Sequence, residues 1–192
     1  AFAAALALVG CAAPPAAQDR FEPLQGADAA RTLESHRWRL DAATDASGRR
    51  IDALFPAGTG AFALVFQGAQ VVVEGRCNSM RGGYELAADG RLVVGRLATT
   101  MKACESALMQ ADAALAKLLA VPLRADVAPG VGPKLRLATP ASESLVLAGE
   151  LTPEARYGPS TVVFLEVAAR RVPCAPPSGE TTCLQVRDRF FD

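Results

Sequence analysis

The sequence predicts an α+β fold: a curled, barrel-like antiparallel β-sheet with one packed helix, plus a short C-terminal β-hairpin segment. Two observations carry this prediction. Between residues 61 and 97, short apolar runs alternate with turn residues, which is the pattern of β-strands. Residues 105–119 instead repeat apolar side chains at helical spacing, and strand-like runs return after them. Strands, one helix and further strands are typical of an antiparallel sheet with a helix against its open side.

The first elements are a short helix, a strand and a hairpin. Residues 27–35 predict the helix, and Trp38 opens the strand two residues before Leu40, which places both side chains on one face. A large aromatic ring at this position favours a core anchor over a binding residue. Residues 61–66 and 70–74 predict two strands joined by a turn that contains Gly68.

A second hairpin and the helix follow. The Asp89–Gly90 pair supplies positive φ and predicts a turn between strands at 84–86 and 91–97. Gly82 and Gly83 predict a break in the chain before this hairpin. The helix over 105–119 is followed by two further predicted strands, residues 134–138 and 144–148.

Several ordered motifs of this domain resemble one family. They are Trp38-x-Leu40, Gly75-Arg76-Cys77-Asn78-x3-Gly82-x-Tyr84, Thr100-x-x-Ala103-Cys104 before the helix, and a final Lys-Leu-x-Leu strand. Together they resemble the META domain of HslJ-like bacterial lipoproteins, and the resemblance assigns residues 28–149 to such a domain. Two positions depart from the family pattern: Arg76 stands where a small residue is common, and Asp112 stands where the helix often has Glu.

The motif residues allow two interpretations. Trp38, Asn78, Gly82, Tyr84 and Thr100 either form a ligand site or hold the polypeptide in its fold. Asn78 and Gly82 suit a turn after Cys77, through local side-chain hydrogen bonding and positive φ respectively. We therefore expect a structural role for the motif.

The five cysteines fall into three groups. Cys77 ends a predicted strand and Cys104 precedes the helix, while Cys174 and Cys183 bracket a loop rich in Pro, Gly and Ser. We expect two disulfides, Cys77–Cys104 and Cys174–Cys183, and hence an oxidising compartment. The gaps of 27, 70 and 9 residues lack the paired C-x2–4-C spacing of structural zinc sites, so no metal is expected.

The fifth cysteine, Cys11, ends the run Leu8-Val9-Gly10-Cys11, which resembles a bacterial lipobox. Residues 1–10 would then be the remnant of a signal peptide whose start is missing, and Cys11 would carry lipid. Residues 11–27, rich in Ala, Pro and Gln, would form a flexible tether. Ala12 follows the cysteine instead of Asp, which by resemblance to Gram-negative lipoproteins favours the outer membrane, facing the periplasm.

The C-terminal part predicts a linker over 150–160, with two prolines and one glycine, and a β segment over 161–192. Strands are expected at 161–167 and 184–187. The flanks of Cys174 and Cys183 resemble the opening of a small uncharacterised domain often fused to META domains, whose later half is missing here. Two strands alone are marginally stable, so this segment must lean on the main domain, be stapled by its disulfide, or be poorly ordered.

Composition and motifs argue against several functions. Twenty Lys and Arg balance twenty Asp and Glu without a run of five like charges, which argues against a nucleic-acid partner. His36 is the sole histidine and no Gly-x-Ser-x-Gly elbow is present, so a hydrolase triad is not expected. The sequence predicts a protein that is not an enzyme and needs no cofactor.

The resemblance implies a lipid-anchored envelope protein that contributes to stress tolerance, by an activity that the family leaves open. Two alternatives remain. A carrier of a small apolar ligand would need a roomy pocket lined by Phe62, Phe66, Leu86 and Leu97. An inhibitor or chaperone-like partner of a periplasmic protein would need an exposed apolar patch of several hundred Å².

Overall fold

The computed structural model describes residues 19–58, 60–159, 165–175 and 179–188. The chain divides after Thr152 into two compact units. Residues 1–18, which hold the predicted signal peptide remnant, Cys11 and the first part of the tether, lie outside the described residues.

The first unit contains ten strands of one sheet, two α-helices and a single 3-10 turn among its described residues. In chain order, its first elements are β1 (Glu22–Pro23), α1 (Ala29–Glu34), β2 (His36–Thr44), the 3-10 turn η1 (Asp52–Leu54), β3 (Ala63–Gln67), β4 (Gln70–Glu74) and β5 (Ser79–Leu86). The remaining elements are β6 (Arg91–Val94), β7 (Ala98–Thr99), α2 (Ser106–Leu119), β8 (Leu123–Ala128), β9 (Lys134–Ala138) and β10 (Ser144–Leu151).

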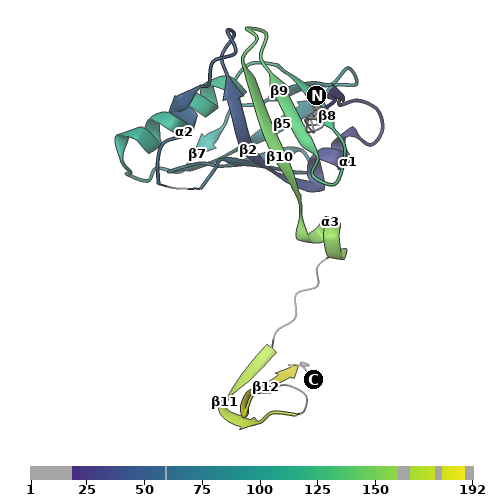
Figure 1. The fold of residues 1–192 in the computed structure, drawn as a ribbon, viewed down its shortest axis with the longest axis vertical. Helices are drawn as coiled ribbons and strands as arrows, with labels where there is room; N and C mark the ends of the chain where they lie inside the picture. Colours follow the sequence, from purple (N-terminus) through teal and green to yellow (C-terminus); the bar gives the residue numbers. More distant parts are fainter. Residues whose placement is uncertain (1–18, 59, 160–164, 176–178, 189–192) are drawn as a thin grey trace, which may run out of the picture. The chain divides into compact units, whose positions relative to one another are not determined.

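Eight of these strands close into an antiparallel barrel (Figure 1). The order around the ring is β8-β6-β5-β4-β3-β2-β10-β9, and pairing between β8 and β9 completes it. The two-residue strands β1 and β7 add to β8 and β5. The predicted α+β fold with a curled sheet and a packed helix is therefore confirmed, and the sheet closes completely into a barrel.

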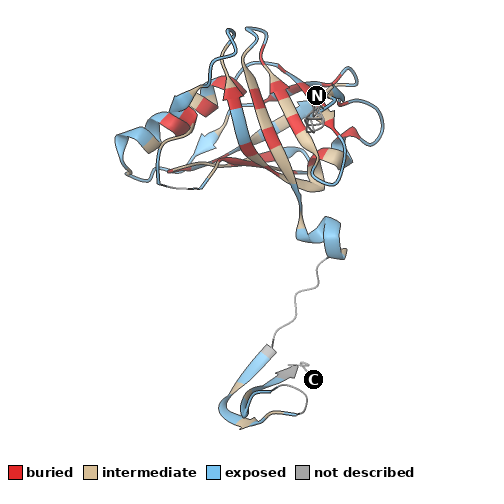
Figure 2. Cartoon of the chain, in the orientation of Figure 1, coloured by how far each residue is buried: buried red, intermediate tan, exposed pale blue. Residues whose placement is uncertain are grey.

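The barrel interior is filled by side chains. Strand residues alternate between inside and outside, as Val71 and Val73 in β4 illustrate, because successive side chains of a strand point to opposite faces. Trp38, Phe62 and Phe66 are the largest completely buried side chains. Figure 2 shows the buried residues as bands along the barrel strands and on α2. Helix α2 adds its own buried residues to this core, Ala111, Leu115, Leu118 and Leu119.

Trp38, for which a core position is expected, has no exposed surface. Its indole N–H donates a hydrogen bond to the carbonyl of Leu33, 2.9 Å away. Gly149 on the neighbouring strand β10 leaves room for the ring, because a Cβ at that position would lie 2.8 Å from Cζ3 of Trp38. The ring is therefore both packed and hydrogen-bonded.

The predicted break at Gly82 and Gly83 is wrong, because both residues lie inside strand β5. Gly82 does not have positive φ. It is required for close approach, since a Cβ there would lie 2.9 Å from the carbonyl oxygen of Arg96 and 3.0 Å from Cδ2 of Leu97. The glycine thus admits the segment that follows β6 against the strand.

The sheet of the first unit includes residues on both sides of the predicted range 28–149. Glu22 and Pro23, expected in the tether, pair with Val127 and Asp126, and Leu24 is 3% exposed. Strand β10 continues into the predicted linker as far as Leu151. Residues 22–23 are held by pairing with β8, and residues 150–151 by pairing with β2. Both partners are distant in sequence, so no local sequence pattern predicts this pairing.

In the residues that the structure describes, the second unit contains a short helix and one hairpin. Helix α3 (Pro153–Tyr157) lies within the predicted linker, and β11 (Leu165–Pro173) pairs antiparallel with β12 (Thr182–Asp188). Residues 161–164 of the predicted strand at 161–167 lie outside the described residues. The apolar side chains of Val167, Leu184 and Val186 are each about half exposed, at 52–53%. The hairpin therefore has no core of its own among these residues.

Within the ranges that the structure describes, no helix combines the length and the apolar character needed to cross a membrane.

Candidate functional site

Several motif residues meet beside helix α2, at the connection from β4 to β5. We call this group the motif cluster, and it consists of Cys77, Asn78, Thr100, Cys104 and Asp112. Its members come from the β4–β5 connection, the segment after β7 and the middle of α2. The remaining motif residues, Trp38, Gly82 and Tyr84, lie elsewhere in the barrel.

The carboxylate of Asp112 is the centre of the cluster. It is 5% exposed and accepts backbone N–H bonds from Arg76 at 2.7 Å, Cys77 at 3.2 Å and Asn78 at 2.7 Å. Hydrogen bonds to an ionised acceptor are about twice as strong as neutral ones. Three consecutive amides are therefore held by one side chain of the helix.

Gly75 makes this arrangement sterically possible. A Cβ at residue 75 would lie 1.8 Å from the backbone oxygen of Asn78 and 2.8 Å from Oδ1 of Asp112. Neither a backbone atom nor a buried, hydrogen-bonded carboxylate can move aside cheaply. The β4–β5 connection can therefore fold over the carboxylate only with glycine at this position.

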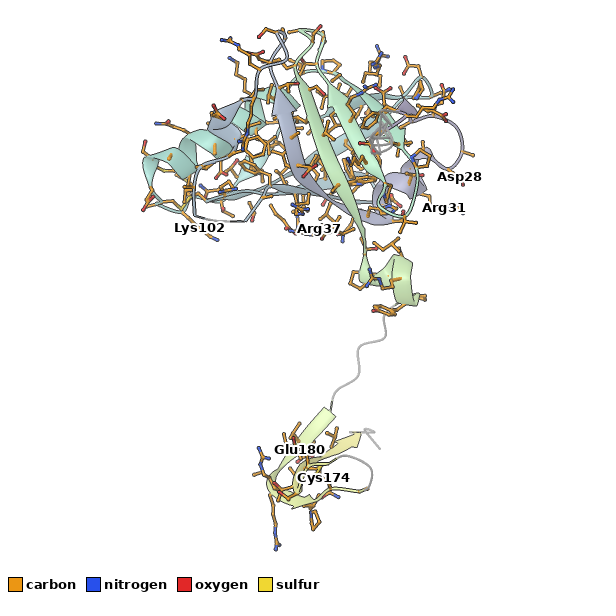
Figure 3. The ribbon with its side chains drawn as sticks, in the orientation of Figure 1. Asp28, Arg31, Arg37, Lys102, Cys174 and Glu180 are labelled. Carbon is orange, nitrogen blue, oxygen red and sulfur yellow. A yellow bond between two sulfur atoms is a disulfide. The ribbon has the colours of Figure 1, made fainter. Side chains whose placement is uncertain are left out.

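Asn78 ties the connection to the segment that precedes α2. Its Oδ1 accepts hydrogen bonds from the backbone N–H of Lys102 at 2.7 Å and from the Thr100 hydroxyl at 3.0 Å. The Thr100 hydroxyl in turn accepts the N–H of Ser79 at 3.1 Å. Lys102 is labelled in Figure 3. The expected local hydrogen bonding of Asn78 is present, since its Nδ2 donates to Sγ of Cys77 at 3.2 Å, and its Oδ1 in addition has partners 22 and 24 residues away in sequence.

Both predicted disulfides are confirmed. Cys77 and Cys104 are bridged with their Cα atoms 6.0 Å apart, and Cys174 and Cys183 with theirs 5.0 Å apart. The first bridge joins the end of β4 to the segment just before α2, where the Asn78 hydrogen bonds also lie. Covalent and hydrogen-bonded links therefore reinforce each other at this point of the fold.

A Cys77→Ala/Cys104→Ala chain is expected to lose about 3.5 kcal/mol of unfolding free energy, the loop-entropy value for a bridge of this span. Urea unfolding followed by Trp38 fluorescence measures the loss, since Trp38 is the sole tryptophan. The matched control is Cys174→Ala/Cys183→Ala, whose bridge lies in the second unit and should leave the Trp38 transition unchanged. If both double variants had the same urea midpoint in Trp38 fluorescence, the Cys77–Cys104 bridge would not stabilise the barrel more than the Cys174–Cys183 bridge does, which contradicts the prediction.

The polar groups of the motif cluster are engaged with one another. In the described part of the chain, Nε of Arg76 is the single buried side-chain nitrogen or oxygen without a hydrogen-bond partner, while its Nη2 donates to the carbonyl of Pro56. Asp112, Asn78 and Thr100 thus fix three chain segments. This geometry supports the structural interpretation of the motif.

Tyr84 and His36 contribute to packing. Tyr84 meets Phe66 edge-on with ring centroids 4.9 Å apart, and burial raises the pKa of its hydroxyl. His36 Nδ1 lies 3.0 Å from the hydroxyl of Ser35 and 3.1 Å from the carbonyl of Thr32. The residues that the structure describes contain no group of three or more His, Cys, Asp or Glu side chains able to hold a metal ion.

Two hollows lie on the outside of the barrel, on either side of the turn between β9 and β10. The larger, of about 750 Å³, is lined by three arginines and several hydroxyl groups: Asp89, Arg91, Pro122, Leu123, Arg124, Arg136, Ala138, Thr139, Pro140, Ser142 and Ser144. The smaller, of about 340 Å³, lies between α2 and the same turn and is mainly apolar: Ile51, Ala114, Lys117, Leu118, Val121, Thr139, Pro140, Ala141 and Glu143.

The residues expected to line a carrier pocket are not brought together around a cavity. Phe62 and Phe66 are fully buried in the filled core and line neither hollow. Leu86 and Leu97 contribute to separate, shallow depressions of about 240 and 270 Å³. An apolar ligand therefore has no room among these four side chains.

The motifs of the sequence do not mark Asp112 or the three arginines as site residues. One signal for Asp112 exists: it falls on the apolar stripe of the helix, in phase with Leu108, Leu115 and Leu119. A carboxylate at such a position needs partners in the core. Arg91, Arg124 and Arg136 meet only through strand pairing, which the sequence alone does not give.

Comparison with known proteins places this architecture. The family model described as META domain matches residues 31–151, more than half of the 192-residue chain. The NMR structure of a protein from Burkholderia xenovorans has the same fold, with a TM-score of 0.56 and 22% identity over 73% of this chain and 97% of that one. No curated protein matches the chain. Because the META domain model matches most of the chain, and because the chain forms a closed barrel with the motif cluster, the chain belongs to the META domain family.

Proposed function

We propose that this protein is a non-enzymatic, lipid-anchored component of the cell envelope, attached to the outer membrane through Cys11 and facing the periplasm. There it contributes to envelope stress tolerance. The observation that carries the proposal is the disulfide in each of the two units, because such bridges persist in oxidising compartments and are rare in the cytosol. The Leu8-Val9-Gly10-Cys11 run adds a lipid-accepting cysteine to an exported chain.

The geometry supports a role without catalysis. The polar motif residues bind one another and the backbone, so they present no reactive group to a substrate. His36 contacts its near neighbours at the start of β2 and lies outside the motif cluster. A rigid, filled barrel suits a protein that acts by binding at its surface.

Replacement of Cys11 is expected to release the protein from the membrane. In Cys11→Ser the hydroxyl cannot take the lipid, and a chain without acyl groups loses the hydrophobic insertion that holds it. Fractionation of cells that express the full-length precursor should move the protein from the detergent-requiring membrane fraction to the soluble periplasmic extract.

The control for this experiment is Cys174→Ser/Cys183→Ser, which also removes cysteine but should leave the protein in the membrane fraction. Mass spectrometry of the wild-type N-terminal peptide should find acyl chains on Cys11. Retention of Cys11→Ser in the detergent-requiring fraction would refute the anchor.

A partner protein in the periplasm is the second candidate function, favoured by the apolar hollow of about 340 Å³ between α2 and the β9–β10 turn. Ile51, Leu118 and Val121 line it, and Val121 remains partly exposed. A hollow of this kind fits a single apolar side chain of another protein. Crosslinking from a photoreactive residue at position 121, compared with one at exposed position 131, tests for such a partner.

A further inference from the structure

The larger hollow on the barrel wall contains an unusual arrangement of charge, which we call the arginine groove. It is defined by Arg91 on β6, Arg124 on β8 and Arg136 on β9, together with Ser142 in the β9–β10 turn and Ser144 at the start of β10. Arg91 lies far from the others in sequence, and the pairing of β6 with β8 brings it beside Arg124.

Two of the arginines are direct cross-strand neighbours. Arg91 pairs with Arg124 in the register between β6 and β8. Like charges directly opposite each other on a sheet destabilise it. Arg91 forms no ion pair with any residue that the structure describes. A bound anion between these two guanidinium groups would turn the repulsion into attraction.

A buried carboxylate holds the guanidinium groups of Arg124 and Arg136 in place. Asp126 is 3% exposed at its side chain, and its Oδ2 accepts from Nε of Arg124 at 3.2 Å and from Nη2 of Arg136 at 2.8 Å. The Arg136 guanidinium also stacks over the Phe21 ring, 4.5 Å from its centroid. Both cations are thereby oriented in advance of any ligand, which lowers the entropic cost of binding.

The charges of the groove do not cancel. The residues that line it carry three guanidinium groups and one carboxylate, Asp89; Asp126, which does not line it, offsets one further charge, and Glu143 lines the smaller hollow, so the lining itself is positive. The Asp89 carboxylate accepts the backbone N–H of Arg91 at 3.1 Å and so belongs to the turn. An anionic ligand would compensate the remaining charge.

Ser142 supplies an independent sign of function. It is the sole non-glycine residue with positive φ in the described ranges, at 65°. It ends a three-residue turn in which Ser142 N–H donates to the Thr139 carbonyl and Thr139 N–H donates to the Glu143 carbonyl. Hairpins of this length favour glycine at the left-handed position. A serine there accepts backbone strain and places a hydroxyl-bearing residue on the groove wall.

From this geometry we infer that the arginine groove binds a ligand through a phosphate group. Guanidinium groups recognise phosphate oxygens by paired hydrogen bonds, and the serine hydroxyls of the lining can add donors. A hollow of about 750 Å³ is within the usual range of small-molecule sites. The phosphate can belong to a soluble phosphomonoester or to a lipid headgroup, and the two sources are separable by experiment.

The test uses the full chain carrying Cys11→Ser, so that no lipid anchor contributes to vesicle binding. One arm titrates glycerol 3-phosphate by calorimetry. The other measures co-flotation with phosphatidylcholine vesicles that contain phosphatidic acid, against vesicles of phosphatidylcholine alone. Saturable binding in the first arm assigns a soluble ester, and flotation that requires phosphatidic acid assigns a headgroup. Binding in neither arm overturns the inference.

Variants then locate the site. Arg91→Gln and Arg124→Gln should each weaken binding about tenfold, the effect of losing one hydrogen bond to a charged group. The matched control is Arg81→Gln, an exposed strand arginine outside the groove, which should leave the affinity unchanged. Equal losses in all three variants would show nonspecific attraction and overturn the assignment.

Ser142→Gly separates binding from folding. Glycine adopts positive φ without strain, so this variant should keep or raise the melting temperature. It should also weaken phosphate binding about threefold, because the hydroxyl is lost. An unchanged affinity with a raised melting temperature would remove Ser142 from the site and overturn that part of the assignment.

Discussion

An Asp112→Ala chain is expected to lose about 4 kcal/mol of unfolding free energy, since three buried N–H groups lose their acceptor at about 1–3 kcal/mol each, partly offset by water. Arg76, Cys77 and Asn78 all donate to this one carboxylate. Alanine cannot accept a hydrogen bond and also leaves space beside Gly75. Urea unfolding followed by Trp38 fluorescence gives the measurement, because this side chain is the sole tryptophan.

The series Asp112→Ala, Asp112→Asn and Asp112→Glu resolves the cause. Asn keeps one acceptor oxygen but loses the charge, and Glu keeps the carboxylate at the cost of one added methylene group. The expected order of destabilisation is Ala, then Asn, then Glu. Gln110→Ala is the control on the same helix, because Gln110 is exposed and its side chain donates to the Ser106 hydroxyl on the helix surface. A loss under 1 kcal/mol for Asp112→Ala would show that the carboxylate does not hold the β4–β5 connection.

Trp38→Ala is expected to lower the free energy of unfolding by about 3–5 kcal/mol, the range for truncating a large buried aromatic side chain. The ring is fully buried, packs beside Gly149, and donates its N–H to the Leu33 carbonyl. Because the variant has no tryptophan, circular dichroism must follow its unfolding. Trp38→Phe should lower the free energy of unfolding by less, because phenylalanine fills most of the volume of the indole ring. This variant chiefly loses the hydrogen bond to the Leu33 carbonyl.

The control for size is Met101→Ala, which truncates a large side chain that is 99% exposed and should stay within about 0.5 kcal/mol of wild type. If Trp38→Ala kept its melting temperature but lost binding to an envelope partner, Trp38 would be a binding residue instead of a core anchor.

Local pattern was sufficient for much of the fold. The spacing of apolar residues and the turn residues predict the β3–β4 hairpin, helix α2 and strand β9. Each of these elements buries one face, so its apolar residues recur at the spacing of that element. Strand β8 was not predicted. Its residues 123–128 combine arginine, aspartate and alanine with few large apolar side chains, and its role in closing the ring depends on partners far along the chain.

The site was harder to predict than the fold for the same reason. Cysteine spacing and element ends were enough to pair Cys77 with Cys104. The local pattern of Asn78 predicts a hydrogen bond near Cys77, which its Nδ2 makes, but the partners of its Oδ1 and of Asp112 lie 22–36 residues away and are brought close only by the fold. The glycine at 82 shows the same limit, because its requirement comes from the carbonyl of Arg96, which lies in the segment between β6 and β7.

The pairing of β2 with β10 has a consequence for how the chain folds. Most neighbours in the ring are consecutive strands, but this pair joins His36 to Leu151. Bringing such distant segments together costs more chain entropy than forming a hairpin, so the local hairpins form early and this seam closes late. While residues 144–151 are still being synthesised, β2 keeps an unpaired edge that neighbouring chains can join. The interval before the seam closes is therefore when the protein is most exposed to aggregation.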